Sequence, residues 1–525
     1  MLRAFRAISL CNWPGLAAAA LLLVCGCVTD TVAGAGPLPV SEQVFSVAYN
    51  RIFEIFLQPV DMARLSIDGL SGLRTLDHLL TVIRLPQSVE IKRGSRLVTE
   101  FAVPDGNDPN AWAALTTIAL ERARQFSPEL HDATPDQLYQ AVFDGLVADL
   151  DAYSRYTNPV RAGNERAIRD GYGGVGMSLD LVAGRYTVRE LVSRGPAERA
   201  GITVGELIEA IDGTATKRMN EQSVRDSLRG PPGSLVHLTV GNMLNGAMAI
   251  SPQRAVTLHR ERVVSNSVRL RLDNDIIILK VERFNAATAV NLREAIVQAQ
   301  SKLGRRAVGF ILDLRGNPGG LLDQAVAVSD LFLRRGRIVS TAGRHPDSWQ
   351  RFDAIGDDLL HEWPVVVLVD GRSASASEIV AAALQDSGRA IVVGASSYGK
   401  GSVQTVTRLP NDGELFLTWS RIYAPSGYTL HRQGVQPTIC TSRDESTVDG
   451  VLAPLRNGQL EQPSVLARWR ALAPDDESAL AHLRQACPWK AHEPELDILV
   501  AERLLKVPAL YRSALAQSTT AVAER

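Results

Sequence analysis

The sequence predicts a multidomain α/β protein with helical segments at both ends. At 525 residues the chain is long enough for about three domains. Val365–Val369 is a continuous run of mostly branched apolar residues, typical of a strand buried on both faces, and a helical run, 378–385, follows it. Residues 276–279 and 308–314 are further strand-like runs, and 287–303 between them is helical in pattern. Strands that alternate with helices predict an α/β core.

The first 27 residues have the features of an export signal. Two arginines precede an apolar stretch, residues 16–24, which is too short and too close to the N-terminus for a good spanning helix. Val-Cys-Gly-Cys at 24–27 looks like a bacterial lipobox, in which a small residue precedes the cysteine that is lipidated. Cys27 fits better than Cys25, because Gly26 is small. We expect a protein lipid-anchored to a bacterial membrane in the periplasm; the alternative is an ordinary cleaved signal with incidental cysteines.

Composition argues against nucleic-acid and metal sites. The 56 basic and 57 acidic side chains give a net charge of −1, which implies no nucleic-acid partner. The histidines are scattered, and apart from the two lipobox cysteines no pair has zinc-site spacing, so we expect neither metal nor cofactor. No later segment reaches eighteen uninterrupted apolar residues, and we expect no transmembrane helix in the mature chain. Cys440 and Cys487 remain there as an even pair that could form one disulfide.

Residues 28–165 are expected to form a tether and a helical domain. The tether is short, small and polar. Apolar residues then recur at helical spacing over 44–80, and again over 112–124 and 138–154. A strand-like stretch interrupts this pattern, so we interpret about 80–130 as a variable insert.

Region 166–250 contains an ordered series of glycine motifs. The glycine-rich turn 173–177 opens a strand, and its backbone amides could hold a peptide's terminal carboxylate. Gly-Pro-Ala at 195–197 and Gly-Glu-Leu-Ile at 205–208 follow, and a helix is expected over Glu221–Leu228. This series resembles a PDZ domain, in which the strand and the helix enclose a peptide groove. The resemblance implies carboxylate binding by Gly174, Val175, Gly176 and Met177. A PDZ domain that only braces a catalytic domain is the alternative.

A serine and a lysine in region 251–440 carry the most specific signal. Ser375 lies at a strand-to-helix turn, where free amides of the first helical turn and the helix dipole favour an oxyanion beside the hydroxyl. None of the nine histidines sits in a motif that supplies a base. Lys400, in a Gly-Lys-Gly loop, can serve if burial brings its pKa down to about 7 to 8. Strand alternation places Gln404 on the same side, where it could orient the amine.

Taken singly, these features are common in structural roles, as a helix cap and a solvated loop. Together, Ser-Ala-Ser-Ala-Ser-Glu-Ile at 373–379 and Gly-Lys-Gly-Ser-Val-Gln at 399–404 resemble the carboxyl-terminal processing, or tail-specific, proteases. The resemblance covers roughly residues 135–440. It implies a crotonase-like core of ββα units and a Ser375/Lys400 dyad assisted by Gln404.

The same resemblance implies an oxyanion hole. The loop Arg-Gly-Asn-Pro-Gly-Gly gives one amide, from Gly319 or Gly320, and Ala376 gives the other. A plain β-turn is the alternative for this loop. Asp386 is also shared with the family, but eleven helical residues place it about 16 Å from Ser375, too far for a hydrogen bond. We therefore interpret Asp386 as structural.

Residues 441–525 contain no recognisable motif. Two helical stretches, 463–484 and 493–515, are expected, the second broken near Pro508.

The sequence therefore predicts a lipid-anchored periplasmic serine endopeptidase whose PDZ domain selects polypeptides with free, apolar C-termini. A catalytically idle peptide-binding scaffold is disfavoured, because Ser375, Lys400 and Gln404 are all present. A crotonase-like acyl enzyme is disfavoured by the PDZ domain and the signal peptide. The sequence does not indicate whether an activating adaptor or a homo-oligomer is involved.

Overall fold

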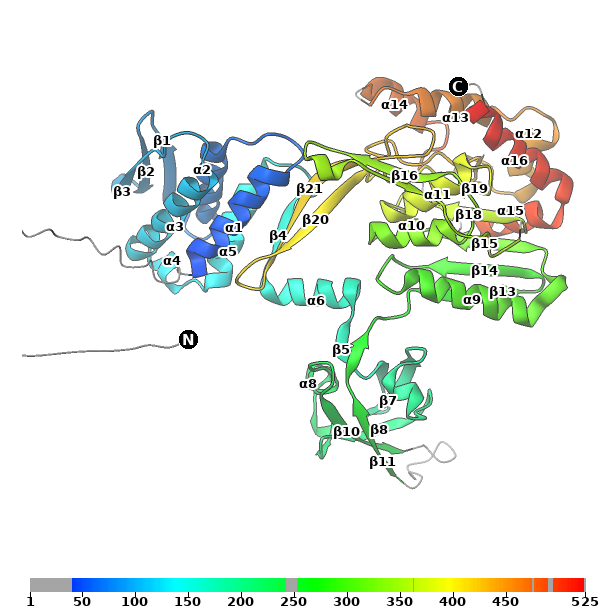
Figure 1. The fold of residues 1–525 in the computed structure, drawn as a ribbon, viewed down its shortest axis with the longest axis horizontal. Coiled ribbons are helices and arrows are strands. Elements are labelled where there is room, and N and C mark those ends of the chain that lie inside the picture. Colours follow the sequence, from blue (N-terminus) through cyan, green and yellow to red (C-terminus); the bar gives the residue numbers. More distant parts are fainter. Residues whose placement is uncertain (1–39, 242–252, 362, 475, 490–493, 524–525) are drawn as a thin grey trace, which may run out of the picture. The chain divides into compact units, whose positions relative to one another are not determined.

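The computed structural model describes residues 40–525 except 242–252, 362, 475, 490–493 and 524–525 (Figure 1). The proposed lipidation site, Cys27, and the tether lie outside the described residues. Among the residues described, none of the helices combines the length and apolarity that a bilayer crossing requires. The same residues contain no cluster of three or more His, Cys, Asp or Glu side chains suited to a metal ion. The elements confirm a mixed α/β architecture with helices at both ends.

The N-terminal helical region builds one core from helices and a small sheet. Its elements are α1 (Val40–Ile55), α2 (Met62–Ser71), β1 (Leu80–Arg84), β2 (Ser88–Arg93), β3 (Arg96–Ala102), α3 (Pro109–Phe126), α4 (Pro128–Asp132) and α5 (Pro135–Ala148). Trp112 on α3 and Ile91 on β2 are buried in the same core as Phe45 on α1. The segment 80–130, interpreted from the sequence as an insert, therefore contributes to the core of this region.

The PDZ region is an antiparallel sheet with a helix beside its first strand. The sheet order is β11 (Arg254–His259), β10 (Leu235–Gly241), β8 (Leu207–Ile211), β7 (Arg185–Leu191) and β6 (Met177–Val182). Val224 and Leu228 of α8 (Glu221–Leu228) pack in one core with Val175 and Met177. The chain enters through β5 (Tyr172–Gly174) and leaves through β12 (Glu261–Val263), and these two strands pair with each other. The expected helix and opening strand are confirmed.

The central region contains a six-stranded sheet. Its order is β13 (Val268–Asp273), β14 (Ile276–Val281), β15 (Gly309–Asp313), β18 (Val365–Val369), β19 (Ile391–Gly394) and β22 (Ile439–Cys440), as Figure 1 shows for the labelled strands. All of these pair in parallel except β13 with β14. The carboxyl ends of parallel strands share one edge, which is where open α/β sheets bind ligands.

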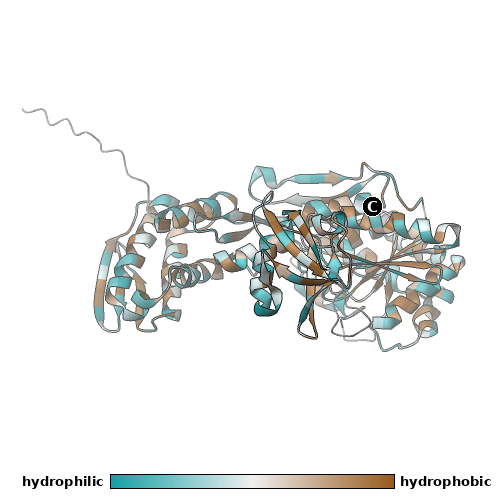
Figure 2. Ribbon diagram, turned by 90° about the horizontal axis from the view of Figure 1, so that it is seen from below, coloured by the Kyte–Doolittle hydropathy of each residue, from teal (hydrophilic) through white to brown (hydrophobic). Residues whose placement is uncertain are grey.

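Both faces of this sheet are covered, and Figure 2 shows its strands mostly in the hydrophobic colour. Val365 and Val367 of β18 point into a core shared with α9 (Thr288–Leu303), α10 (Leu322–Asp330) and α11 (Ala376–Asp386). Val366 and Leu368 point to the opposite face, into a core shared with α12 (Val448–Arg456), α15 (Pro494–Lys506) and α16 (Pro508–Ala523). The C-terminal extension is helical and broken before Pro508, as predicted, but the stretch expected over 463–484 is two helices, α13 (Gln462–Ala471) and α14 (Glu477–Arg484), and α12 was not expected. Helices α12, α15 and α16 supply the second helical layer, whereas α13 and α14 pack into the first core.

A second sheet carries the segment after the predicted base. Its order is β17 (Gln350–Asp353), β16 (Arg337–Ala342), β21 (Glu414–Tyr423) and β20 (Ser402–Arg408), and β4 (Arg155–Thr157) pairs with β21. The loop 395–401 connects β19 of the first sheet to β20 of the second. Helix α6 (Pro159–Asp170) follows β4 and leads to the PDZ region. Ala162 is its one buried residue.

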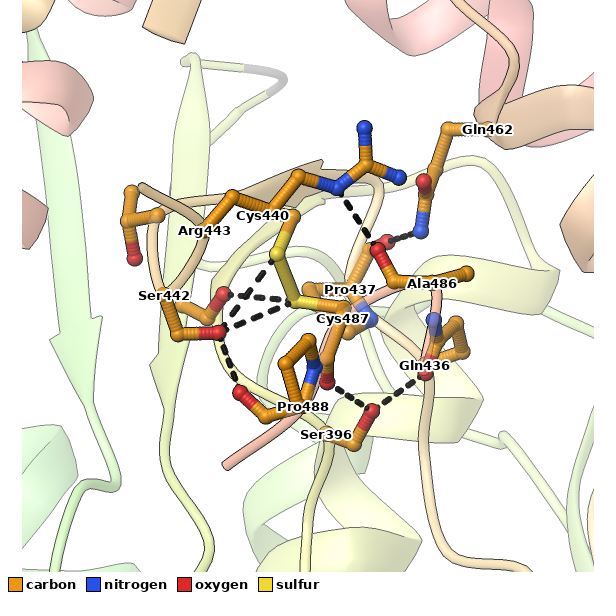
Figure 3. The surroundings of a disulfide bond; sticks show 12 residues. Ser396, Gln436, Pro437, Cys440, Ser442, Arg443, Gln462, Ala486, Cys487 and Pro488 are labelled. Atoms are coloured by element: carbon orange, nitrogen blue, oxygen red, sulfur yellow. Dashed lines mark hydrogen bonds between the residues drawn. A yellow bond between two sulfur atoms is a disulfide. The ribbon is translucent and has the colours of Figure 1, made fainter. Parts of the chain in front are cut away.

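Cys440, at the end of β22, is joined to Cys487 by a disulfide with a Cα–Cα separation of 5.7 Å (Figure 3). Cys487 follows α14 (Glu477–Arg484), which α13 (Gln462–Ala471) precedes. The carbonyl oxygen of Cys487 accepts hydrogen bonds from the amide and the hydroxyl of Ser396, at 3.2 and 2.6 Å. The C-terminal extension is thus attached to the loop that leads to Lys400.

Candidate active site

The loops at the carboxyl ends of four neighbouring strands converge on one cavity of about 410 Å³. Residues 283–285 follow β14, 318–322 follow β15, Ser375 follows β18, and Lys400 follows β19. The remaining wall comes from α11, β4, α6, β20 and β21, through Ala376, Ile379, Arg155, Glu165, Ile168, Arg169, Ser402, Val403, Gln404, Val406, Phe416 and Ile422, with Tyr153 just before β4. Strand order therefore brings together residues that are far apart in the sequence.

Three serines stand in the motif at 373–377, and their surroundings differ. Ser373 is fully buried, and its hydroxyl donates to the carbonyl oxygen of Leu314 at 2.9 Å. Ser377 is also fully buried and donates to the carbonyl oxygen of Asn317 at 3.0 Å. Ser375 is partly exposed and lines the cavity. Two serines thus attach the turn to the loop after β15, and Ser375 is the one presented to a substrate.

The backbone at Ser375 is strained, with φ 56° and ψ −114°. A residue with a Cβ rarely occupies this region, and such a conformation costs about 1 to 3 kcal/mol unless its surroundings enforce it. One enforcing contact is the hydrogen bond from the Ser375 amide to Glu378 Oε2, at 2.7 Å. Strain at a strand-to-helix turn lifts the side chain out of the helix and into the cavity.

Glu378 joins the serine turn to the lysine loop. Its carboxylate is fully buried. Oε2 accepts from the amides of Ser375 and Lys400 at 2.7 and 2.9 Å, and Oε1 accepts from the amide of Gly399 and the hydroxyl of Ser397 at 2.6 and 2.5 Å. Burial raises the pKa of this carboxyl, and the four donors act in the opposite direction. A single side chain therefore sets the spacing between the two loops.

Lys400 is half-buried, and burial lowers the pKa of its amine, with the positive charge of Arg155 adding to the effect. Its Nζ lies 5.3 Å from the ring centroid of Tyr153. The ring of His431 lies edge-on to that of Tyr153, with 6.4 Å between the ring centroids, and His431 is held neutral, since burial and the neighbouring Arg421 lower its pKa to about 4. An amine in this setting is poised to take up a proton.

Gln404 lies on the wall of the same cavity. Its amide nitrogen donates to the hydroxyls of Ser402 and Thr418, at 3.0 and 3.3 Å. These two bonds orient the side chain and leave the amide oxygen as the atom suited to accept from a lysine amine.

The two glycines of the predicted oxyanion loop differ in what their amides do. The amide of Gly319 donates to Asn317 Oδ1 at 2.8 Å, so it already has an acceptor. Gly320 forms a parallel bridge with Phe284, whose carbonyl oxygen accepts from Leu321 at 2.9 Å. Successive amides of an extended chain point in opposite directions, so the Gly320 amide points away from Phe284. The geometry favours Gly320 over Gly319 as an oxyanion donor.

The loop after β15 and the serine turn are in direct contact. The amide of Ala374 donates to the carbonyl oxygen of Asn317 at 3.0 Å. A Cβ at Gly319 would lie 2.8 Å from the Cβ of Ser375, so only glycine fits there. Ala376 is the first residue of α11, where backbone amides lack helical acceptors. The amides of Gly320 and Ala376 thus come from two loops that are locked together.

Asp386 is the last residue of α11, at the opposite end from Ser375. Its Oδ2 accepts from the amide and the hydroxyl of Ser426, at 3.0 and 2.6 Å. Its Oδ1 accepts from Arg470 Nε at 3.0 Å. These contacts agree with the structural interpretation.

Comparison with known proteins extends this picture. Residues 275–441 match peptidase family S41, and residues 187–241 match a PDZ domain. A carboxy-terminal-processing protease of Bartonella bacilliformis is 36% identical over 349 residues, which cover 66% of this chain and 79% of the relative. The chain belongs to the carboxy-terminal-processing proteases of peptidase family S41. This is a family of serine proteases with a PDZ domain.

Other relatives span the same regions. A carboxyl-terminal-processing protease of Picosynechococcus is 32% identical over 312 residues, covering 58% of this chain and 73% of the relative. Among solved structures, a photosystem II D1 C-terminal processing protease aligns over 76% of this chain and 92% of its own, with a TM-score of 0.38 and 24% identity.

The PDZ domain of this family member holds a second cavity, of about 320 Å³, between β6 and α8. Of the predicted carboxylate turn, Val175 and Met177 line it. Gly174 instead pairs with Glu261 in the short β5–β12 ladder, and the carbonyl oxygen of Gly176, at φ 75°, accepts from Val192.

The turn end of the PDZ cavity also carries a positive charge. Arg229 lines the cavity just after α8, with its guanidinium carbon 4.4 Å from the ring centroid of Tyr172. The next amide, of Gly230, donates to the carbonyl oxygen of Gly173 at 3.1 Å, so Arg229 is held beside the glycine-rich turn.

Sequence reasoning missed two residues of the protease site. Glu378 lies within the serine motif, and the motif alone assigns it no role in the site, although a Ser followed three residues later by Glu is a capping-box signal. Arg155 was not singled out. No local pattern marks it, because its place in the wall depends on β4 pairing with β21.

Proposed function

We propose that this chain is a Ser/Lys endopeptidase in which Ser375 is the nucleophile and Lys400 the general base. The observation that carries the proposal is that both residues line one cavity and both donate their amides to Glu378 Oε2. Ser375 stands on a strained turn, and burial shifts the pKa of Lys400 toward the neutral amine. A neutral amine can take the hydroxyl proton as Ser375 attacks the scissile carbonyl, and can then pass it to the leaving amine.

In this proposal the amides of Gly320 and Ala376 hold the negative oxygen of the tetrahedral intermediate. Gln404 accepts a hydrogen bond from the Lys400 amine through its amide oxygen and so orients the lone pair toward Ser375. Hydrolysis of the acyl-enzyme repeats the sequence with water, and Lys400 again serves as base.

The protease assignment is tested with purified variants and an unfolded polypeptide substrate. Ser375→Ala and Lys400→Arg should each lose at least about three orders of magnitude in rate, because the loss of either the nucleophile or its base disables the whole catalytic unit. Arginine keeps the charge but does not become neutral, so it separates a base from a positively charged contact. Near-native cleavage by either variant would remove that residue from the mechanism.

We also propose that the PDZ cavity captures substrates by a free, apolar C-terminus. A peptide tail would add a strand beside β6, with its last side chain among Val175, Met177 and Leu228. Amides of the glycine-rich turn and the Arg229 guanidinium would bind the carboxylate. Charge-assisted hydrogen bonds contribute about 1.5 to 3 kcal/mol, so amidation of the tail should weaken binding roughly ten- to a hundredfold.

The test of tail selection compares one unfolded substrate that ends in a free apolar tail, an amidated tail or a charged tail. The free apolar tail should be cleaved fastest, and the fluorophosphonate labelling rate of Ser375, measured without substrate, checks that each assay contains the same amount of competent enzyme. Equal cleavage of all three would leave the PDZ domain as a structural brace.

For location, we propose a lipid-anchored enzyme of the bacterial periplasm. The lipobox at 24–27 motivates the anchor, and the Cys440–Cys487 disulfide is typical of an oxidising compartment. A fully lipidated cysteine carries several acyl chains, enough for stable retention. Cys27→Ser should release the enzyme into the soluble fraction or leave it unprocessed; normal processing with unchanged membrane fractionation would refute the anchor.

A further inference from the structure

Arg155 is held rigidly in the wall of the cavity that contains Lys400. Its guanidinium carbon lies 3.7 Å from the ring centroid of Phe416, which is its partner across the β4–β21 ladder. Its Nη2 donates to Glu165 Oε2 on α6 at 2.8 Å. A guanidinium stacked on one side and bonded at one edge has little freedom, so its charge occupies a defined place in the cavity that Lys400 also lines.

The charge of Arg155 is only partly offset. The second carboxylate oxygen of Glu165 accepts from Arg161 Nε at 3.0 Å, so one carboxylate serves two guanidinium groups. Arg169, another basic residue of the wall, pairs with Glu414 and Asp170. An excess of positive charge therefore remains around Arg155.

The groups that face Lys400 come from three elements. Asp151 and Tyr153 precede β4, Arg155 lies on it, and Glu378 lies on α11. Both carboxylates accept hydrogen bonds from the protein: Asp151 from the amides of Tyr153 and Ser154, and Glu378 from three amides and one hydroxyl. The Tyr153 ring also contacts the neutral His431, whose Nδ1 is 3.1 Å from the Arg421 guanidinium.

We propose that Arg155 is a positioning residue that keeps Lys400 in its neutral, proton-accepting form, and that Glu165 moderates this effect. The inference rests on the proposed role of Lys400 as the base. A fixed positive charge that shares a cavity with an amine disfavours a second positive charge there. Arginine suits this task because it stays protonated at every pH at which the enzyme works. Glu165, as its paired carboxylate, weakens the repulsion.

The experiment measures kcat/KM against pH, with an unfolded polypeptide that has a free apolar C-terminus as substrate. Arg155→Met should move the midpoint of the rise to higher pH by about 0.5 to 1 unit, as expected for loss of one partly screened like charge. Well below the midpoint this is a roughly three- to tenfold loss of rate, recovered at high pH. Arg155→Lys should stay near the native midpoint, and Glu165→Gln should move it to lower pH.

Arg161→Met is the matched control, since Arg161 binds the same carboxylate but is 67% exposed and lies outside the cavity wall. Its midpoint should move by much less than that of Arg155→Met, because an exposed charge is largely screened by solvent. A uniform loss of rate in Arg155→Met with an unchanged midpoint would overturn the proposal, because it would indicate support of the fold alone. Thermal unfolding and fluorophosphonate labelling at high pH show whether that variant is folded.

The two hypotheses fail in different ways. Activity of Lys400→Arg near the native level would refute the base itself. An inactive Lys400→Arg together with a native midpoint in Arg155→Met would refute the role of Arg155 alone.

Discussion

Arg470 and Asp386 form an ion pair whose side chains are 3% and 1% exposed, between α13 of the C-terminal extension and the end of the helix that begins after Ser375. The two residues are 84 positions apart in the sequence. Removing one partner of a buried pair leaves an uncompensated charge, which costs far more than the pair contributes.

We therefore predict that Asp386→Asn lowers the free energy of unfolding by roughly 3 to 5 kcal/mol, measured by urea denaturation. The double variant Asp386→Asn/Arg470→Met should recover part of that loss, since it removes both charges. Fluorophosphonate labelling of Ser375, per folded molecule, should stay near the native level. Loss of labelling in folded Asp386→Asn protein would instead assign Asp386 to the chemistry.

A second prediction concerns the stability cost of the proposed base. The pKa of Lys400 is lowered in the folded protein, so the unfolded chain binds the proton more tightly than the folded protein does. At any pH at which the unfolded chain carries this proton, Lys400 therefore lowers the free energy of unfolding. Lys400→Met should therefore be inactive but melt at a higher temperature than the native enzyme. The difference should be largest below the folded-state pKa and vanish as pH rises toward the ordinary lysine value, near 10.4. A lower melting temperature at neutral pH would contradict this.

The third prediction concerns Glu378. Glutamine has one acceptor oxygen in place of two, and its NH2 group would face donors, so Glu378→Gln disrupts the joint between the serine turn and the lysine loop. We expect a loss of at least about a hundredfold in fluorophosphonate labelling rate, since misplacement by about 1 Å is enough for such an effect. Peptide binding to the PDZ domain should be unaffected. Glu121→Gln, on the exposed surface of α3, is the control; native labelling by Glu378→Gln would show that the joint is dispensable.

The fourth prediction concerns the disulfide, which closes a loop with a sequence separation of 47. Chain entropy then gives about 4 kcal/mol of stabilisation. Reductant should lower the denaturation midpoint of the native enzyme and leave that of Cys440→Ser/Cys487→Ser unchanged. Equal midpoints for the native and double-variant proteins without reductant would mean that the bond adds nothing.

Much of this architecture could be predicted because its signals are local. Val365–Val369 is apolar at every position, which indicates a strand that is buried on both faces. In the structure its side chains alternate between the two cores on either side of the sheet. The helix after Ser375 and the break before Pro508 were likewise visible in short windows.

What could not be predicted depends on contacts between distant segments. The sequence left Gly319 and Gly320 as equals, and only the bond to Asn317 and the bridge to Phe284 distinguish them. The carboxylate turn was predicted as a set of four, yet Gly174 is engaged in pairing with β12. Arg155 reaches the cavity because β4 pairs with β21, and the hydrophobic pattern of the sequence does not predict which strands pair.

The side chains of β18 point alternately to the two faces of the sheet, and this sets a lower limit on the length of a working enzyme. The part that matches the peptidase family ends at residue 441, yet Val366 and Leu368 are covered by helices that begin at Val448. A fragment cut at the family boundary would expose an entire apolar sheet face to water and is expected to aggregate. The residues that carry no recognisable motif are therefore as necessary to a soluble protease as those that carry the motif.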